Sequence, residues 1–281
     1  MNLHTALVLG RVSNLPTVWT NALAALALAG ALPPPGALLL LLVSLSLFYT
    51  GGMYLNDAFD AEIDRAERAR RPIPAGLVDQ RTVLAWGIFQ LGLATLLAFT
   101  LGLGVGLAAI ALGAAIVAYD LWHKRTALSP VLMGLCRFLV YLMAAMVIAG
   151  VNAPVLFGAF GLFCYIVGLT YAAKQEAYDR VGSLWPLMVL SIPVLFAASF
   201  TPGNVVALVF WLGLVGWMGW ALHLLTRRQP GDVPRAVVSL IAGIALYDAT
   251  LMAGVGALVP ALLAVAAFGL TLLLQRWAPG T

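Results

Sequence analysis

Apolar runs as long as a membrane-crossing helix follow one another along nearly the whole chain. About 20 helical residues are needed to cross about 30 Å of hydrocarbon. Pro, Gly and charged residues divide the sequence into ten runs near that length: 15–31, 37–55, 83–101, 103–119, 131–150, 154–173, 184–200, 205–225, 235–253 and 256–275. Because lipid leaves backbone polar groups no other partner, the runs predict an all-α bundle of nine or ten transmembrane spans.

The composition excludes a soluble globular protein. Hydrophobic residues make up 63% of the 281 residues and charged residues only 9%, whereas soluble domains carry about 25% charged residues. The longest polar segment, 56–80, is too short to hold a core of its own. We therefore expect residues 1–281 to form a single integral-membrane domain.

The loops between the runs alternate between uncharged and charged sequences. The uncharged loops are rich in Gly and Pro, and the others carry nearly all the Lys, Arg, Asp and Glu residues. By the positive-inside rule, the charged loops of a multi-pass protein of the cell (inner) membrane face the cytoplasm. The net charge of +4 then reflects contact with membrane lipid and topology, and we expect no nucleic-acid partner.

A cluster of acidic residues follows the second run and begins with Asn56. Asp57, Asp60 and Asp64 are spaced i, i+3 and i+7, so on a helix they share one face. Three like charges on one face repel each other unless cations lie between them. Mg²⁺ takes carboxylate oxygens and completes its octahedron with water and phosphate, so the spacing predicts a site for a magnesium-bridged diphosphate.

Basic residues come directly after this cluster. Arg65, Arg68, Arg70 and Arg71 lead into the turn 72–76, and guanidinium groups bind phosphate oxygens in a fork geometry. The alternative is an ordinary charged loop whose acids and bases pair with one another and with lipid headgroups.

The pattern Asn56-Asp57-x-x-Asp60-x-x-x-Asp64, followed by Arg71-Pro72-Ile73-Pro74-Ala75-Gly76, resembles the first aspartate-rich motif of UbiA-type intramembrane prenyltransferases. The resemblance implies a helical bundle of about nine spans with a central cavity open to the cytoplasm. It also implies Mg²⁺-dependent transfer of a polyprenyl group from a polyprenyl diphosphate to an aromatic or other lipophilic acceptor. On this resemblance Asp57, Asp60 and Asp64 are catalytic metal ligands, and Asn56, Arg68 and Arg71 bind substrate.

Two further segments resemble the family less closely. Residues 119–125 are similar to its Tyr and Lys-Arg loop, so Lys124 and Arg125 are candidate diphosphate contacts, with simple membrane anchoring as the alternative. Residues 171–180 stand where the family carries a second Asp-x-x-x-Asp motif, but Gln175 takes the place of the first aspartate. The remaining candidates there are Glu176 and Asp179 as metal ligands and Lys174 as a phosphate contact.

Polar residues inside the runs give weaker signals. Arg137 lies about two turns inside a span, where it binds substrate or extends to the headgroups. Asp248 is either a site residue or paired with a neighbouring helix, and Asn14 and Asn21 line the cavity or bond between helices. The histidines, His123 among them, are interpreted as isolated interfacial residues.

The sequence thus predicts an Mg²⁺-dependent prenyltransferase. The main alternative is a non-catalytic UbiA-like protein that binds or moves an isoprenoid or lipid phosphate, because Gln175 removes one formal charge from the second motif.

Overall fold

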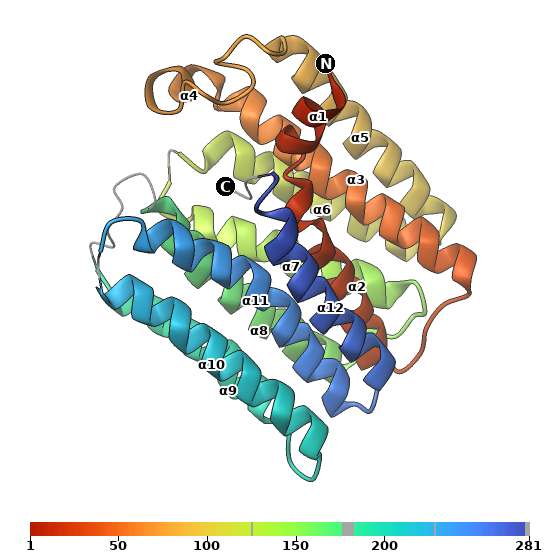
Figure 1. Cartoon of the computed structure of the whole chain (residues 1–281). Helices are drawn as coiled ribbons and strands as arrows, with labels where there is room; N and C mark the ends of the chain where they lie inside the picture. The colour runs from red at the N-terminus through yellow and green to blue at the C-terminus, as the bar shows by residue number, and fades with distance from the viewer. Residues whose placement is uncertain (125, 176–182, 228, 279–281) are drawn as a thin grey trace.

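The computed structural model describes residues 1–124, 126–175, 183–227 and 229–278. All regular structure in these residues is helical, and the helices form one bundle (Figure 1). The elements are α1 (Leu3–Leu9), η1 (Val12–Asn14), α2 (Leu15–Ala29), α3 (Pro35–Phe59), α4 (Ala61–Glu67), α5 (Gln80–Thr100), α6 (Leu103–Trp122), α7 (Ser129–Met146), α8 (Ala153–Lys174), η3 (Trp185–Leu190), α9 (Ser191–Ala198), α10 (Val205–Arg227), α11 (Asp232–Gly254) and α12 (Leu258–Leu274).

Local sequence sets the ends of these helices. Side-chain oxygens of Asp79 and Asn152 cap α5 and α8 by accepting from backbone N–H groups of the first turn. Helix α2 ends at Gly30, whose φ of 95° is the left-handed conformation that glycine adopts at little cost. These caps explain why the apolar runs break where they do.

In the part of the chain that the structure describes, seven helices are long and apolar enough to cross a membrane, namely α3, α5, α6, α7, α8, α10 and α11. The other three expected spans are shorter. Residues 184–200 form no single helix but a 3₁₀ segment, η3, followed by the eight residues of α9. Helices α2 and α12 have 15 and 17 residues. The prediction of an all-α, multi-pass membrane protein is confirmed.

Helix α11 is the most deeply buried of the seven long helices, with 89% of its apolar window inside the bundle. It packs against α2, α8, α10 and α12. Helices α3 and α5 also pack closely, because a Cβ added at Gly51 would lie 3.1 Å from the Gly87 carbonyl oxygen, and one added at Gly87 would lie equally near the Gly51 carbonyl oxygen. Together these contacts fix the helices whose ends build the site.

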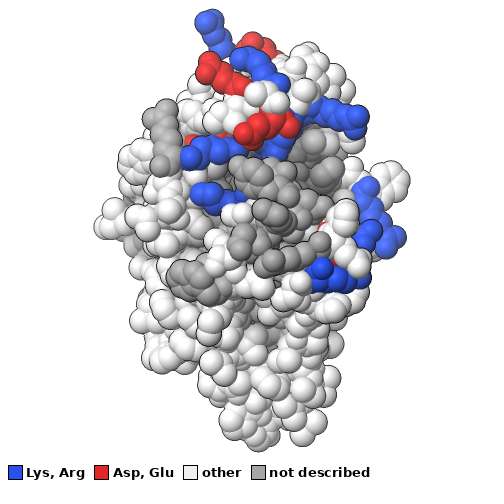
Figure 2. Space-filling model, turned by 90° about the vertical axis from the view of Figure 1, so that its left-hand side faces the viewer, with Lys and Arg blue, Asp and Glu red and all other residues white. Residues whose placement is uncertain are grey.

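Charged side chains gather toward one end of the molecule, over α4 and the neighbouring loops (Figure 2). The opposite end shows no Lys, Arg, Asp or Glu in this view. The described structure therefore has one polar end and one apolar end, as the alternation of loops predicts.

Candidate active site at the mouth of a membrane cavity

A cavity of about 840 Å³ lies between helices α2, α3, α6, α7, α8 and α11. Its interior is mainly apolar, whereas its mouth carries charged groups. The apolar wall includes Val18, Leu45, Phe48, Leu112, Ile116, Val140, Ile166, Leu169 and Ile244. The charged groups of the mouth include Arg11, Asp60, Arg68, Arg71, Lys124 and Lys174.

The first motif begins inside a helix and not after one. Helix α3 continues through Phe59, so Asn56 and Asp57 lie in its last turn, and Asp64 lies in α4. Backbone hydrogen bonds from Asp60 N to Asn56 O (2.9 Å) and from Asp64 N to Asp60 O (2.8 Å) continue the helical register across the junction. The three aspartates are all buried, and the helical spacing between them continues across the junction.

Arg71 joins two of these carboxylates. Its Nη1 donates to Asp57 Oδ1 at 3.1 Å and to Asp64 Oδ2 at 2.9 Å. The side chain of Asp64 is only 2% exposed, against 16% for Arg71. Ile73, two residues further on, packs with Tyr54 and fixes the turn that carries Arg71. Asp60 and Arg71 line the cavity directly, whereas Asp57 and Asp64 reach it through Arg71.

Arg11 is a site residue that the sequence interpretation did not assign. Its Nη2 donates to Asn56 Oδ1 at 3.2 Å and to Asp57 Oδ1 at 3.0 Å. Its backbone has φ 42° and ψ 45°, a left-handed conformation that is costly for a residue with a side chain. The only sequence signal was its place just before the first span, because its partners lie 45 and 46 residues away.

Asp60 pairs with the end of α6. His123 Nε2 lies 3.1 Å and Lys124 Nζ 3.8 Å from Asp60 Oδ2. Burial acts to raise the pKa of Asp60, but the hydrogen bond and attraction of His123, with Lys124 and Arg71, hold that pKa below its usual value. The interpretation of His123 as an isolated interfacial residue is therefore wrong. The sequence did not reveal the pairing, because His123 and Asp60 are 63 positions apart.

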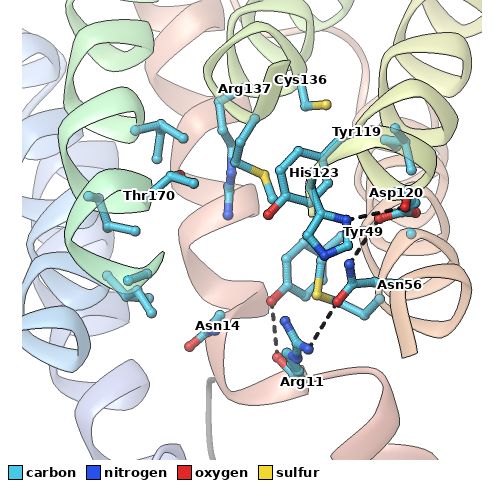
Figure 3. A pocket seen from close by; sticks show the side chains of 18 of the residues that line it. Arg11, Asn14, Tyr49, Asn56, Tyr119, Asp120, His123, Cys136, Arg137 and Thr170 are labelled. Carbon is cyan, nitrogen blue, oxygen red and sulfur yellow. Dashed lines mark hydrogen bonds between the residues drawn. The ribbon is translucent and has the colours of Figure 1, made fainter. Parts of the chain in front are cut away.

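A further carboxylate in the cavity comes from α6. Asp120 is 4% exposed, and its Oδ1 accepts a hydrogen bond from Asn56 Nδ2 at 3.2 Å. Figure 3 shows Asn56 between Arg11 and Asp120 on the cavity wall. The sequence interpretation counted Asp120 only among the charges of its loop.

The second motif is only partly visible. Lys174 Nζ donates to the carbonyl oxygens of His123 and Thr126 and, at 2.9 Å, to Ser129 Oγ, so it ties α8 to the loop between α6 and α7. Gln175 lines the cavity at the end of α8. Three of the expected site residues, Arg125, Glu176 and Asp179, lie outside the described residues.

Arg137 lies on the cavity wall, on the far side of Tyr49 from Arg11 in Figure 3. It donates to Asn21 Oδ1 at 2.7 Å and to Thr17 Oγ1 at 3.2 Å, and its Cζ is 5.7 Å from the centre of the Tyr49 ring. The guanidinium therefore lies on the cavity wall, bonded to polar side chains of α2, and does not extend to the headgroups.

Asp248 pairs with neighbouring helices, one of its two expected roles. It is fully buried and accepts from Thr20 Oγ1 at 2.6 Å, Asn21 Nδ2 at 2.7 Å and Tyr141 Oη at 2.5 Å. Asn21 thus bridges Asp248 and Arg137, while Asn14 lines the cavity.

The carboxylate oxygens of the site are suitable ligands for Mg²⁺, but they do not form a complete metal site by themselves. The described residues contain no group of three His, Cys, Asp or Glu side chains close enough to hold a metal, since Arg11, Arg71, His123 and Lys124 separate the carboxylates. Within the same residues, Asp64 Oδ1 and Asp120 Oδ2 are buried without a hydrogen-bond partner. Mg²⁺ commonly needs only one or two carboxylates when phosphate supplies other ligands, so the residues fit a metal that arrives with a diphosphate.

The fold and the site define a multi-pass membrane protein with an acid-base cluster over an apolar cavity. Residues 15–225 match the UbiA prenyltransferase family. Because this match covers more than half of the chain, the chain belongs to the UbiA prenyltransferase family.

Among relatives, the chain is similar to a digeranylgeranylglyceryl phosphate synthase of Methanothermobacter thermautotrophicus, with 32% identity over 133 residues, 47% of this chain and 46% of the relative. The chain thus matches about half the length of this relative, and only 27% of the same-named protein of Thermococcus gammatolerans, at 39% identity over 26% of this chain.

Solved structures share the fold. A structure of digeranylgeranylglyceryl phosphate synthase superposes with a TM-score of 0.65 at 17% identity and covers 90% of this chain and 98% of its own. A UbiA homologue from Archaeoglobus fulgidus bound to GPP and Mg²⁺ superposes with a TM-score of 0.54 at 15% identity, over 95% of this chain and 99% of its own. These likenesses support the arrangement of helices.

Proposed function

We propose that this chain is an Mg²⁺-dependent prenyltransferase that moves a prenyl group from an isoprenoid diphosphate to a lipophilic acceptor within the membrane. One observation carries the proposal: carboxylates and cations gather at the mouth of a cavity whose interior is mainly apolar. An isoprenoid diphosphate has the same division into a charged head and an apolar tail.

In this proposal the mouth binds the diphosphate. Asp57, Asp60 and Asp64 hold the Mg²⁺ that accompanies it, and Asn56 orients Asp57's partner Arg11. The cations Arg68, Arg71, Lys124, Arg125 and Lys174 contact or surround phosphate oxygens, and Glu176 and Asp179 complete the metal side. When bound, Mg²⁺ neutralises charge that develops on the leaving group.

The cavity then controls the reacting carbon. The allylic carbon–oxygen bond breaks, its electron pair leaves with the diphosphate, and an allylic cation forms. Rings of Phe48, Tyr49 and Tyr119 line the cavity, and their negative faces can stabilise that cation. The apolar wall excludes water that would otherwise capture it. The acceptor attacks the cation and loses its proton.

We further propose that the acceptor is a glyceryl phosphate lipid with a free hydroxyl group. The name of the matched relatives supports this class, in place of the aromatic acceptor that the family resemblance suggested. Arg137 offers a second cationic site on the cavity wall, apart from the cluster at the mouth. A charged side chain at this depth needs an anionic or polar partner, and the acceptor phosphate provides one.

The same proposal covers the number of membrane crossings and the side of the membrane to which the cavity opens. We propose that α2, the η3–α9 segment and α12 complete nine or ten crossings, because α2 and α12 pack against each other and against α11. The chain then forms one domain whose cavity opens to the cytoplasm, where the positive-inside rule places the arginines of α4 and its following loop.

Purified protein in lipid nanodiscs tests the proposal. It receives labelled geranylgeranyl diphosphate and Mg²⁺ with either geranylgeranylglyceryl phosphate or 4-hydroxybenzoate. We expect an ether product with the glyceryl phosphate and none after chelation by EDTA. If no diphosphate were released with either acceptor, the proposed prenyltransferase activity would be refuted.

The second candidate is a lipid-phosphate-binding protein without catalysis, favoured by the amide at Gln175. Tight, Mg²⁺-dependent binding of geranylgeranyl diphosphate with no turnover on either acceptor would select it.

A further inference from the structure

Asp120 lines the cavity, and one of its two carboxylate oxygens has no hydrogen-bond partner among the described residues. Asp120 is 4% exposed, and its Oδ2 is buried without a hydrogen-bond partner among the residues that the structure describes. An unsatisfied carboxylate oxygen in a buried position is costly. Such an atom points to a ligand.

Asp120 is bonded directly to the first residue of the first motif, Asn56. Asn56 donates to Asp120 Oδ1 and accepts from Arg11 (Figure 3). Arg11 also donates to Asp57. On the same helix end, His123 lies 3.2 Å from the Asp120 carbonyl oxygen through Nδ1 and 3.1 Å from Asp60 through Nε2. These bonds hold the end of α6 in register with the end of α3.

The second motif has an amide in place of its first carboxylate. Gln175, at the end of α8, stands where the family pattern has an aspartate, and its neutral side chain lines the cavity that Asp120 also lines. An amide oxygen is a weaker partner for Mg²⁺ than a carboxylate because it carries no formal charge.

We propose that Asp120 supplies the carboxylate that position 175 lacks, as an oxygen ligand for the Mg²⁺ that enters with the diphosphate. This inference rests on the proposed function and concerns the same cavity. The charge has moved from α8 to α6, while the number of carboxylates around the diphosphate is maintained.

Binding of geranyl S-thiolodiphosphate, which does not ionise readily, tests the proposal without turnover. Calorimetry gives its Kd with saturating Mg²⁺ and with EDTA for the wild type, Asp120→Asn, Gln175→Asp and the double variant. We expect Asp120→Asn to weaken the Mg²⁺-dependent Kd at least about tenfold, the range seen when metal-site partners are lost. The double variant should recover most of this loss, because the carboxylate returns at position 175.

Asp79→Asn is the matched control, since Asp79 is an exposed helix cap and asparagine caps equally well. If Asp120→Asn bound the thiolodiphosphate with the same Mg²⁺-dependent Kd as the wild type, the inference would be overturned, even if the variant had lost prenyl transfer. A loss that Gln175→Asp does not rescue would overturn it as well, because it would show a merely structural role. If the wild type itself shows no Mg²⁺-dependent binding, the proposed function fails, which is a separate outcome.

Discussion

Replacing Arg71 by Gln should destabilise the protein even without substrate. Asp57 would keep Arg11 as its partner, but Asp64 would lose the Arg71 Nη1 contact at 2.9 Å. Asp64 Oδ1 already lacks a partner among the described residues, and the side chain is 2% exposed. Removing one member of a fully buried ion pair costs roughly 3–5 kcal/mol. Since Arg71 is 16% exposed, we expect about 2–3 kcal/mol after screening.

The assay is equilibrium unfolding of the purified protein by SDS in mixed micelles, followed by circular dichroism. Asp64→Asn and the double variant Arg71→Gln/Asp64→Asn complete a double-mutant cycle. We expect the double variant to be more stable than the sum of the single losses by roughly 1–3 kcal/mol, because no unpaired charge remains. Arg70→Gln, at an exposed neighbouring position, is the control and should change stability by less than about 0.5 kcal/mol. Additive single losses would refute the pairing.

Three other outcomes follow from the site and its support. Asp57→Ala should abolish Mg²⁺-dependent binding of geranylgeranyl diphosphate while the protein stays folded in the membrane, and an unchanged titration would contradict the ligand assignment. Arg137→Gln should raise KM for the glyceryl phosphate acceptor at least about tenfold and leave KM for the diphosphate unchanged, as a lost charged hydrogen bond costs about 1.5–3 kcal/mol; equal effects on both would argue against an acceptor site. Tyr141→Phe removes one donor to buried Asp248 and should lower the free energy of unfolding by about 1–3 kcal/mol in the same SDS titration, with no change expected if that bond were absent.

Local patterns in the sequence were enough to predict the bundle and the first motif. Apolar length located the helices, and the i, i+3, i+7 spacing placed three aspartates on one face, because both depend on residues close in the chain. Helix α9 was missed as a short element since 184–200 is mostly apolar, and hydropathy alone cannot reveal a switch from 3₁₀ to α geometry.

The partners of these aspartates could not be predicted in the same way. The spacing predicted that cations must separate the three charges, and the expected cation was Mg²⁺. In the structure, the guanidinium groups of Arg71 and Arg11 are two of the cations that lie beside these carboxylates. Arg11 reaches the motif from the turn between α1 and η1, and His123 does so from the end of α6. Such contacts depend on how helices pack, which the sequence spacing does not encode.

The most direct test of the central claim is to locate the cation itself. Crystals or frozen-hydrated particles are prepared with Mn²⁺ in place of Mg²⁺ and with geranyl S-thiolodiphosphate, and the metal is found by anomalous scattering or by density. We expect metal and thiolodiphosphate at the mouth of the cavity beside Asp60 and Arg71, with the prenyl tail along the apolar wall. A thiolodiphosphate bound elsewhere, or bound at the mouth with no metal beside these carboxylates, would contradict it.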